Sequence, residues 1–178
     1  MKESLRDAML HHVRYEIAHC MIIPQWRDDA PMLKEAIFLS FFVHARNLIH
    51  FFERTRTKDE DDVYASDFSF PSETLRIAPE DRARFGKDMM HITSKRERHT
   101  SDSKPWPIRT TYAAIKPIAT RFTRHVVDQH ASRLSESERI AWQNLAALLE
   151  SSGDQIIVTE EKPNQTLEPM PLKRHGSS

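Results

Sequence analysis

The sequence predicts an all-α protein folded as an antiparallel helical bundle of about five helices. Apolar residues recur at helical spacing along five segments, which short stretches rich in proline, serine or aspartate separate. Only three glycines occur in 178 residues. β-rich folds, phosphate-binding loops and dinucleotide-binding folds need glycine where the backbone turns tightly or approaches a phosphate. No alternating apolar and polar pattern is long enough to compete with the helical interpretation.

The N-terminal part of the chain contains two predicted helices. The first covers residues 4–22, with Ser4 as its N-cap and Pro24 just beyond its end. The second starts after Asp29, another N-cap residue, and runs to about Arg54. This second helix is the longest and most apolar element that the sequence predicts.

The middle of the chain is polar and contains several prolines. Asp61 or Asp62 is expected to cap a short helix within residues 63–68. A third sizeable helix is expected over residues 79–93, followed by a loop rich in serine, aspartate and proline.

Two further helices are predicted in the C-terminal half. The fourth covers residues 108–134 and contains Pro117, which predicts a kink or a break because proline lacks a backbone donor and clashes with the preceding turn. The fifth begins with a capping box formed by Ser135 and Glu138 and ends near Ser151.

The domain organisation follows from these elements. We expect residues 1–161 to form a single helical-bundle domain. Residues 162–178 are polar, contain three prolines and are expected to form a flexible tail.

Composition limits the classes of protein to consider. Lys and Arg together number 26, as do Asp and Glu, so the chain lacks the basic excess of many nucleic-acid-binding domains. Cys20 is the only cysteine, which excludes an internal disulfide and a cysteine zinc cluster. The polar N-terminus does not resemble a signal peptide, and the apolar run over residues 37–52 is too short and too interrupted to span a bilayer. We therefore expect a cytoplasmic protein without a membrane partner.

The stretch FFVHARNLIHFF, residues 41–52, sets polar side chains into the most hydrophobic segment. At 100° per residue, His44 falls within the apolar arc, whereas Arg46, Asn47 and His50 form a mixed polar stripe on the other side. His44 is expected to be buried and paired with a backbone carbonyl or a side chain. Two interpretations of the stripe remain open. In one, Arg46 pairs structurally with Glu35, Glu53 or Asp62; in the other, Arg46 lowers the pKa of His50 and keeps that imidazole available as a base.

The pair Arg46-Asn47 followed by His50 resembles the motif of the HEPN superfamily, which is an arginine, then commonly a polar residue, then a histidine. The family spacing of four to six intervening residues is three here, whereas Arg124 and His130 have five. The resemblance implies a homodimeric, metal-independent ribonuclease whose motifs face one another. Arg46, Asn47 and His50 would be catalytic, with Arg124 and His130 as the alternative pair.

A second resemblance extends over residues 32–122. The helix containing His44-Ala-Arg-Asn47 and a later segment containing His91, Thr93 and Arg96 are similar to a set of bacterial helical proteins of unassigned activity. This resemblance implies that His44, His91, Thr93 and Arg96 belong to a polar network or a ligand site. The basic residues of the later segment could also form a phosphate-binding patch, with RNA as a candidate partner.

Two hypotheses of function follow. One is a non-catalytic binding or interaction module built around a buried polar network; the other is a HEPN-type ribonuclease. We expect no cofactor and no metal site, because the sequence contains neither an HxxxH nor an HExxH pair.

Overall fold

The computed structural model describes residues 3–23, 31–55, 62–83 and 107–151. Within these ranges the chain is all-helical and has no strand, as the sequence predicts. Its α-helices and 3₁₀ turns are, in order, α1 (Glu3–Ile22), α2 (Pro31–Glu53), η2 (Ala65–Phe68), α3 (Pro79–Ala83), α5 (Ile108–Gln129), η4 (Ala131–Arg133) and α6 (Glu136–Ser151).

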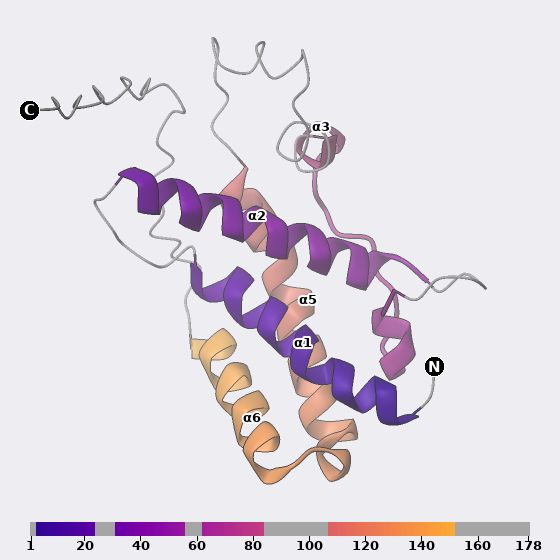
Figure 1. The fold of residues 1–178 in the computed structure, drawn as a ribbon. Helices are drawn as coiled ribbons and strands as arrows, with labels where there is room; N and C mark the ends of the chain where they lie inside the picture. The colour runs from indigo at the N-terminus through magenta and orange to yellow at the C-terminus, as the bar shows by residue number, and fades with distance from the viewer. Residues whose placement is uncertain (1–2, 24–30, 56–61, 84–106, 152–178) are drawn as a thin grey trace, which may run out of the picture.

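The long helices pack as two antiparallel pairs. α1 packs along α2, and α5 packs along α6. Figure 1 shows α1 and α2 side by side in front of α5, with α6 below them, and both front helices also contact α5. No helix in the described ranges is long and apolar enough to cross a membrane.

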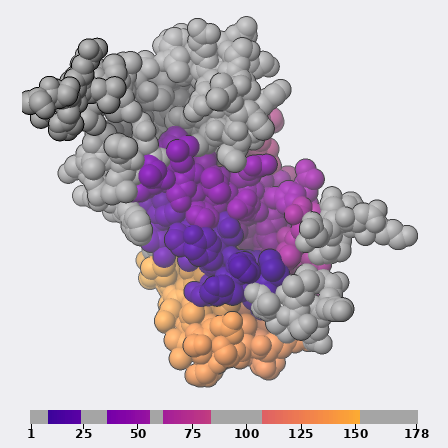
Figure 2. Space-filling view, in the orientation of Figure 1, coloured from indigo at the N-terminus to yellow at the C-terminus, as the bar shows by residue number. Residues whose placement is uncertain are grey.

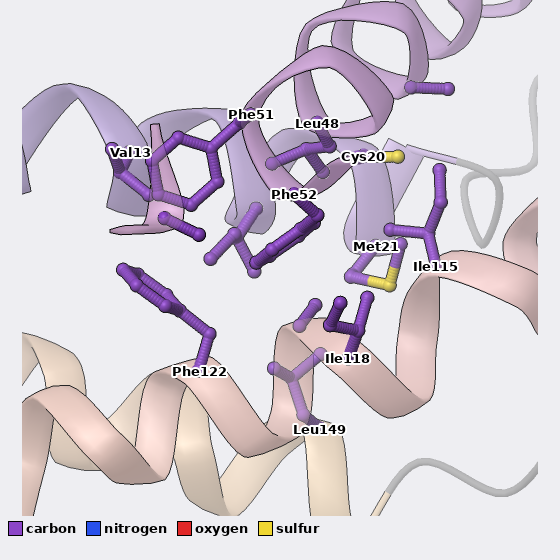
Figure 3. Close-up of a cluster of buried hydrophobic side chains, with 14 of the residues drawn as sticks. Val13, Cys20, Met21, Leu48, Phe51, Phe52, Ile115, Ile118, Phe122 and Leu149 are labelled. Atoms are coloured by element: carbon purple, nitrogen blue, oxygen red, sulfur yellow. The ribbon is translucent and has the colours of Figure 1, made fainter. Parts of the chain in front are cut away.

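One hydrophobic core joins all four long helices, and an aromatic cluster lies at its centre. The fully buried ring of Phe122 on α5 has its centroid 5.1 Å from that of Phe51 and 5.7 Å from that of Phe52, both on α2. Phe68 and Phe70 approach the same ring at 5.8 and 5.3 Å. Figure 3 shows Phe122 facing Phe51 and Phe52, with residues of α1 and α6 around them. The core therefore holds the segment after α2 as well as the helices.

α1 and α2 have nearly the predicted bounds. The predicted cap of α1 is wrong, because the helix begins at Glu3 and Ser4 lies inside it. Asp29, the predicted cap of α2, lies outside the described residues. The capping box is confirmed: the Ser135 backbone N–H donates to the Glu138 carboxylate at 3.0 Å, and the Glu138 N–H donates to Ser135 Oγ at 3.4 Å. This reciprocal pair fixes the start of α6.

Of the kink or break predicted at Pro117, the break is not present. α5 is a single helix from Ile108 to Gln129, and it ends earlier than the predicted residue 134. Pro117 and Ala113, the residue whose carbonyl loses its donor, both lie on the exposed side of the helix. Water can therefore bind the carbonyl that proline leaves without a partner.

The predicted cap of the short helix is also wrong. Tyr64, not Asp61 or Asp62, occupies the N-cap position of η2. The Tyr64 N–H donates to the carboxylate of Asp67 at 2.9 Å, so the stabilising acidic residue lies inside the turn rather than before it.

Several predictions fall outside the described residues. Of the helix expected over 79–93, only Pro79–Ala83 is described. Residues 84–106 and 152–178 are not described, so the later segment with His91, Thr93 and Arg96 and the expected tail stay predictions.

Candidate functional site

The polar stripe of α2 lies on the solvent side of the bundle. Arg46 and Asn47 are exposed, and His50 is half-buried. Arg54 continues the stripe, because its N–H donates to the His50 carbonyl at 3.2 Å and extends the helical pattern past Glu53. Arg46, His50 and Arg54 thus follow one another at four-residue intervals, or about 6 Å per step along the helix. We call these three residues the basic row.

The basic row lines an open groove of about 780 Å³. One side is formed by α1, the floor by the C-terminal half of α2, and the other side by residues after α2. Figure 2 shows α1, α2 and the segment after α2 on one face of the molecule. We call it the α1–α2 groove; besides the basic row, its polar lining residues are His12, Glu16, Asn47, Glu53, Asp62 and Arg82.

Glu53 and Arg82 fix one side of this groove. The Arg82 guanidinium donates to both Glu53 carboxylate oxygens, at 2.7 and 2.6 Å. It also donates to the carbonyls of Leu75 and Ile77, at 2.6 and 3.2 Å. The hydrogen bond with Glu53 raises the pKa of Arg82, against an opposing effect of burial. The charge of Arg82 is therefore used to hold residues 75–82 against the end of α2.

This arrangement removes one of the partners expected for Arg46. Glu53, one of the three carboxylates considered for Arg46, binds Arg82 instead. Within the described ranges, neither Arg46 nor Arg54 forms a salt bridge. Both guanidinium groups are exposed and available to an anionic ligand.

His50 has a looser environment than an ion pair would give it. Its Nε2 lies 3.9 Å from Asp62 Oδ2, which is too far for a hydrogen bond. Its ring centroid lies 5.5 Å from that of the buried Tyr64. The imidazole therefore lies beside a buried aromatic ring, tilted 42° to it, and lines the groove.

His44 is buried and paired, as predicted. The residue is 7% exposed, and its Nδ1 lies 2.8 Å from Oε2 of Glu16 on α1. The two residues are 28 positions apart and join α1 to α2. His44 and Glu16 thus form a part-buried polar pair between α1 and α2, whereas Arg46 and Asn47 are exposed.

Sequence reasoning missed the α1 residues around this pair. The ring of His19 lies 5.2 Å from that of His44, and Tyr15 lies 4.1 Å from His19 and 5.5 Å from His44. Burial, and then the neighbouring His44, lower the pKa of His19, while Glu16 acts in the opposite direction. The spacing of His12, Glu16 and His19 places them on one helical face, and that pattern was the available signal.

The alternative pair, Arg124 and His130, is not brought together at one site. Arg124 is exposed and its Nε donates to Glu150 of α6 at 2.7 Å, which raises the pKa of Arg124. His130 is buried, with its Nε2 3.1 Å from the Phe68 carbonyl. Arg124 lines a separate hollow of about 350 Å³ between α5 and α6 that does not include His130.

Among the described residues, no group of three or more His, Cys, Asp or Glu side chains is arranged to hold a metal ion. The described site is therefore defined by two features: the open groove with the basic row, and the part-buried pair of His44 and Glu16 beside it. Comparison with known proteins finds no matching family model, no similar curated protein and no similar solved structure.

Proposed function

We propose that this chain is a HEPN-like helical protein that binds a phosphate-bearing ligand in the α1–α2 groove without cleaving it. RNA is the ligand class to test first. The observation that carries the proposal is the basic row, in which two exposed arginines without a carboxylate partner among the described residues flank His50 on the groove.

The chemistry of the row suits phosphate. A guanidinium presents a planar fork of donors to two phosphate oxygens, and His50 adds a third polar contact between the two arginines. The regular steps of about 6 Å along the helix allow successive side chains to contact successive phosphates of an extended strand. Asn47 lies on the same surface and offers an amide donor and acceptor.

The charge balance of the groove predicts moderate, salt-dependent binding. Glu16, Glu53 and Asp62 also line it, and the chain has no net charge to attract a polyanion from a distance. For two or three phosphate contacts to a single strand, the logarithm of affinity should fall with the logarithm of salt at a slope of roughly −1.4 to −2.1.

Binding without cleavage is favoured because the groove is open. A guanidinium stabilises a phosphoryl transition state most strongly where water is excluded. Arg46 is exposed to solvent. The Arg46–His50 spacing is also one residue shorter than the shortest spacing of the family motif.

The second candidate is a metal-independent ribonuclease of the HEPN type. In this hypothesis Arg46 stabilises the phosphorane, His50 removes the proton from the ribose 2′-hydroxyl and Asn47 orients the phosphate. The observation favouring it is His12 on α1, which lines the same groove and could protonate the leaving oxygen. Arg124 and His130 would act instead only if they were brought together by a rearrangement.

A homodimer belongs to the same proposal. The exposed face of α2 carries Leu39 and Val43, which are 49% and 42% exposed and lie two turns and one turn before Arg46 and Asn47. A second copy covering this face would bury two apolar side chains and exclude water from the basic row. A dimer is compatible with both candidates, whereas a monomer would count against the ribonuclease, whose motifs would face one another across a dimer; light scattering coupled to gel filtration measures the oligomeric state.

A binding and cleavage experiment on labelled single-stranded RNA in excess EDTA tests both candidates. We expect the wild type to bind without cleavage, Arg46→Ala to bind about 10-fold more weakly, corresponding to the loss of one charged hydrogen-bonding contact, and Arg124→Ala to bind normally. Equal binding by Arg46→Ala and wild type contradicts the groove proposal. Cleavage that Arg46→Ala abolishes establishes the ribonuclease, and cleavage that only Arg124→Ala abolishes selects the alternative pair.

We also propose a cytoplasmic location. Cys20, the only thiol, is fully buried, and burial raises its pKa well above the ordinary value, with the charge of Glu16 acting in the same direction. Such a thiol is protonated and unreactive, which suits a fold that needs no oxidising compartment. Fractionation of cells expressing the tagged chain tests this placement.

A further inference from the structure

Three side chains meet where α1 and α2 pack beside the groove. Glu16 and His19 come from α1, and His44 comes from α2. His44 Nδ1 lies 2.8 Å from Glu16 Oε2, and the ring centroids of His19 and His44 are 5.2 Å apart. We call these three residues the seam cluster.

The carboxylate of Glu16 fixes the orientation and tautomer of His44. In a neutral imidazole that donates from Nδ1, the lone pair lies on Nε2. None of the residues described here forms a hydrogen bond with His44 Nε2. A carboxylate on one nitrogen and a free lone pair on the other is the arrangement found at metal-binding histidines, where the carboxylate orients the ring and raises its basicity.

His19 is placed to act together with His44. It is partly exposed, forms no hydrogen bond with another described residue, and is held by the ring of Tyr15 at 4.1 Å. Two imidazoles bound tetrahedrally to one ion, with metal–nitrogen distances of about 2.0–2.1 Å, have ring centroids about 5 Å apart. The observed 5.2 Å fits this separation.

We propose that His19 and His44 form a two-histidine site for a divalent transition metal ion, Zn²⁺, Ni²⁺ or Cu²⁺, with Glu16 as the residue that positions His44. Imidazole ligands favour these ions over Mg²⁺ and Ca²⁺. The protein supplies two ligands and water supplies the others, because the described residues contain no larger group suited to a metal.

The spacing rules that find metal sites in a sequence could not find this one. His19 and His44 are on different helices, 25 positions apart by their numbers (44 − 19), and only the packing of α1 on α2 unites them. The site lies beside the basic row and uses neither of its arginines. The proposed metal site can therefore be tested independently of RNA binding.

Calorimetric titration of the full chain, without a histidine tag, tests the proposal with Zn²⁺, Ni²⁺ and Mg²⁺ near pH 7.5. We expect saturable binding of about one Zn²⁺ or Ni²⁺ per chain and no binding of Mg²⁺. His19→Ala, at a partly exposed position, should remain folded by circular dichroism and lose this binding. His11→Ala removes an exposed histidine from the same helix and should bind as the wild type does.

Glu16→Gln tests whether Glu16 positions His44 for the metal ion, or whether the ion binds the histidines without help from Glu16. The amide keeps the size of the side chain but removes its charge, and loss of such a partner weakens metal affinity by about 10- to 100-fold. Absence of Zn²⁺ and Ni²⁺ binding by the wild type overturns the site. Retention of wild-type affinity by His19→Ala overturns it equally, since the ions would then bind elsewhere.

Discussion

Arg82 holds Glu53 through both carboxylate oxygens, and the same carboxylate accepts the backbone N–H of Leu75 at 2.7 Å. Arg82 in turn donates to two carbonyls of the segment that leads into α3. One ion pair thus closes the C-terminal end of α2 against residues 75–82. The pair shapes one side of the groove. It also neutralises the charge of Arg82, which would otherwise be available to an anionic ligand.

We therefore expect Arg82→Met to lower the free energy of unfolding by about 1–3 kcal/mol, because it leaves a half-buried carboxylate without its charged donor. Urea denaturation followed by circular dichroism measures the change. The matched control is Arg121→Met, which removes the exposed pair with Glu73 and should cost about 0–1 kcal/mol. Equal costs for the two variants would show that burial of the Glu53 pair adds nothing.

Phe122 should be the most sensitive aromatic position of the core. Its ring is fully buried and contacts rings from α2, from residues 68–70 and from α6. Phe122→Ala is expected to cost about 3–5 kcal/mol, since it removes buried area and leaves a cavity. Phe122→Leu should cost clearly less, and Ile140→Ala, at a 46% exposed position, should cost little. A small effect of Phe122→Ala in denaturant titrations would contradict the central place of this ring.

The sequence predicted a feature well where the residues that cause it lie close together in the chain. The start of α6 could be predicted because Ser135 and Glu138 cap it within one turn. The burial of His44 followed from the wheel, which needs only the helical period. In both cases the deciding residues lie on one element, so the sequence pattern contains the cause.

Features that depend on contacts between elements could not be predicted in this way. The partner of His44 is Glu16, 28 positions away, and no pattern within α2 identifies it. The break expected at Pro117 does not occur, because its cost depends on which side of α5 faces solvent. Glu53, one of the three carboxylates expected as a partner of Arg46, binds Arg82 instead, and only the folded chain brings Arg82 to it.

The seam cluster should make stability depend on pH through His19. Its pKa in the folded chain is lowered, chiefly by burial and then by His44, so the unfolded chain binds more protons between that lowered pKa and about 6.5. The free energy of unfolding should therefore rise with pH through this window, and the stabilisation should be lost as pH falls through the folded pKa. His19→Gln should flatten this part of the profile, measured by urea denaturation between pH 5 and 7.5. His11→Gln, on the same helix but exposed, is the control, and an equally steep profile for His19→Gln would assign the dependence to other groups.

The capping box at the start of α6 gives the last prediction. Ser135→Ala removes the hydroxyl that accepts the Glu138 N–H and donates to its carboxylate at 2.7 Å. Loss of an N-cap costs about 0.5–2 kcal/mol, and Ser135→Asp should retain most of that stability because aspartate is an equally good cap. The hydrogen bonds from Ser135 also lower the pKa of Glu138, so their contribution to the free energy of unfolding is present above pH 4.5 and is lost as pH falls through the folded pKa. Urea denaturation at pH 7 and at pH 3 should therefore show a smaller difference between wild type and Ser135→Ala at the lower pH.

The control for this prediction is Ser132→Ala, at an exposed position in η4, which removes a serine hydroxyl outside the capping box. A Ser135→Ala cost that matches the cost of this control at pH 7 would show that α6 begins at Glu136 for other reasons, chiefly the burial of Trp142 and Leu145 against α5.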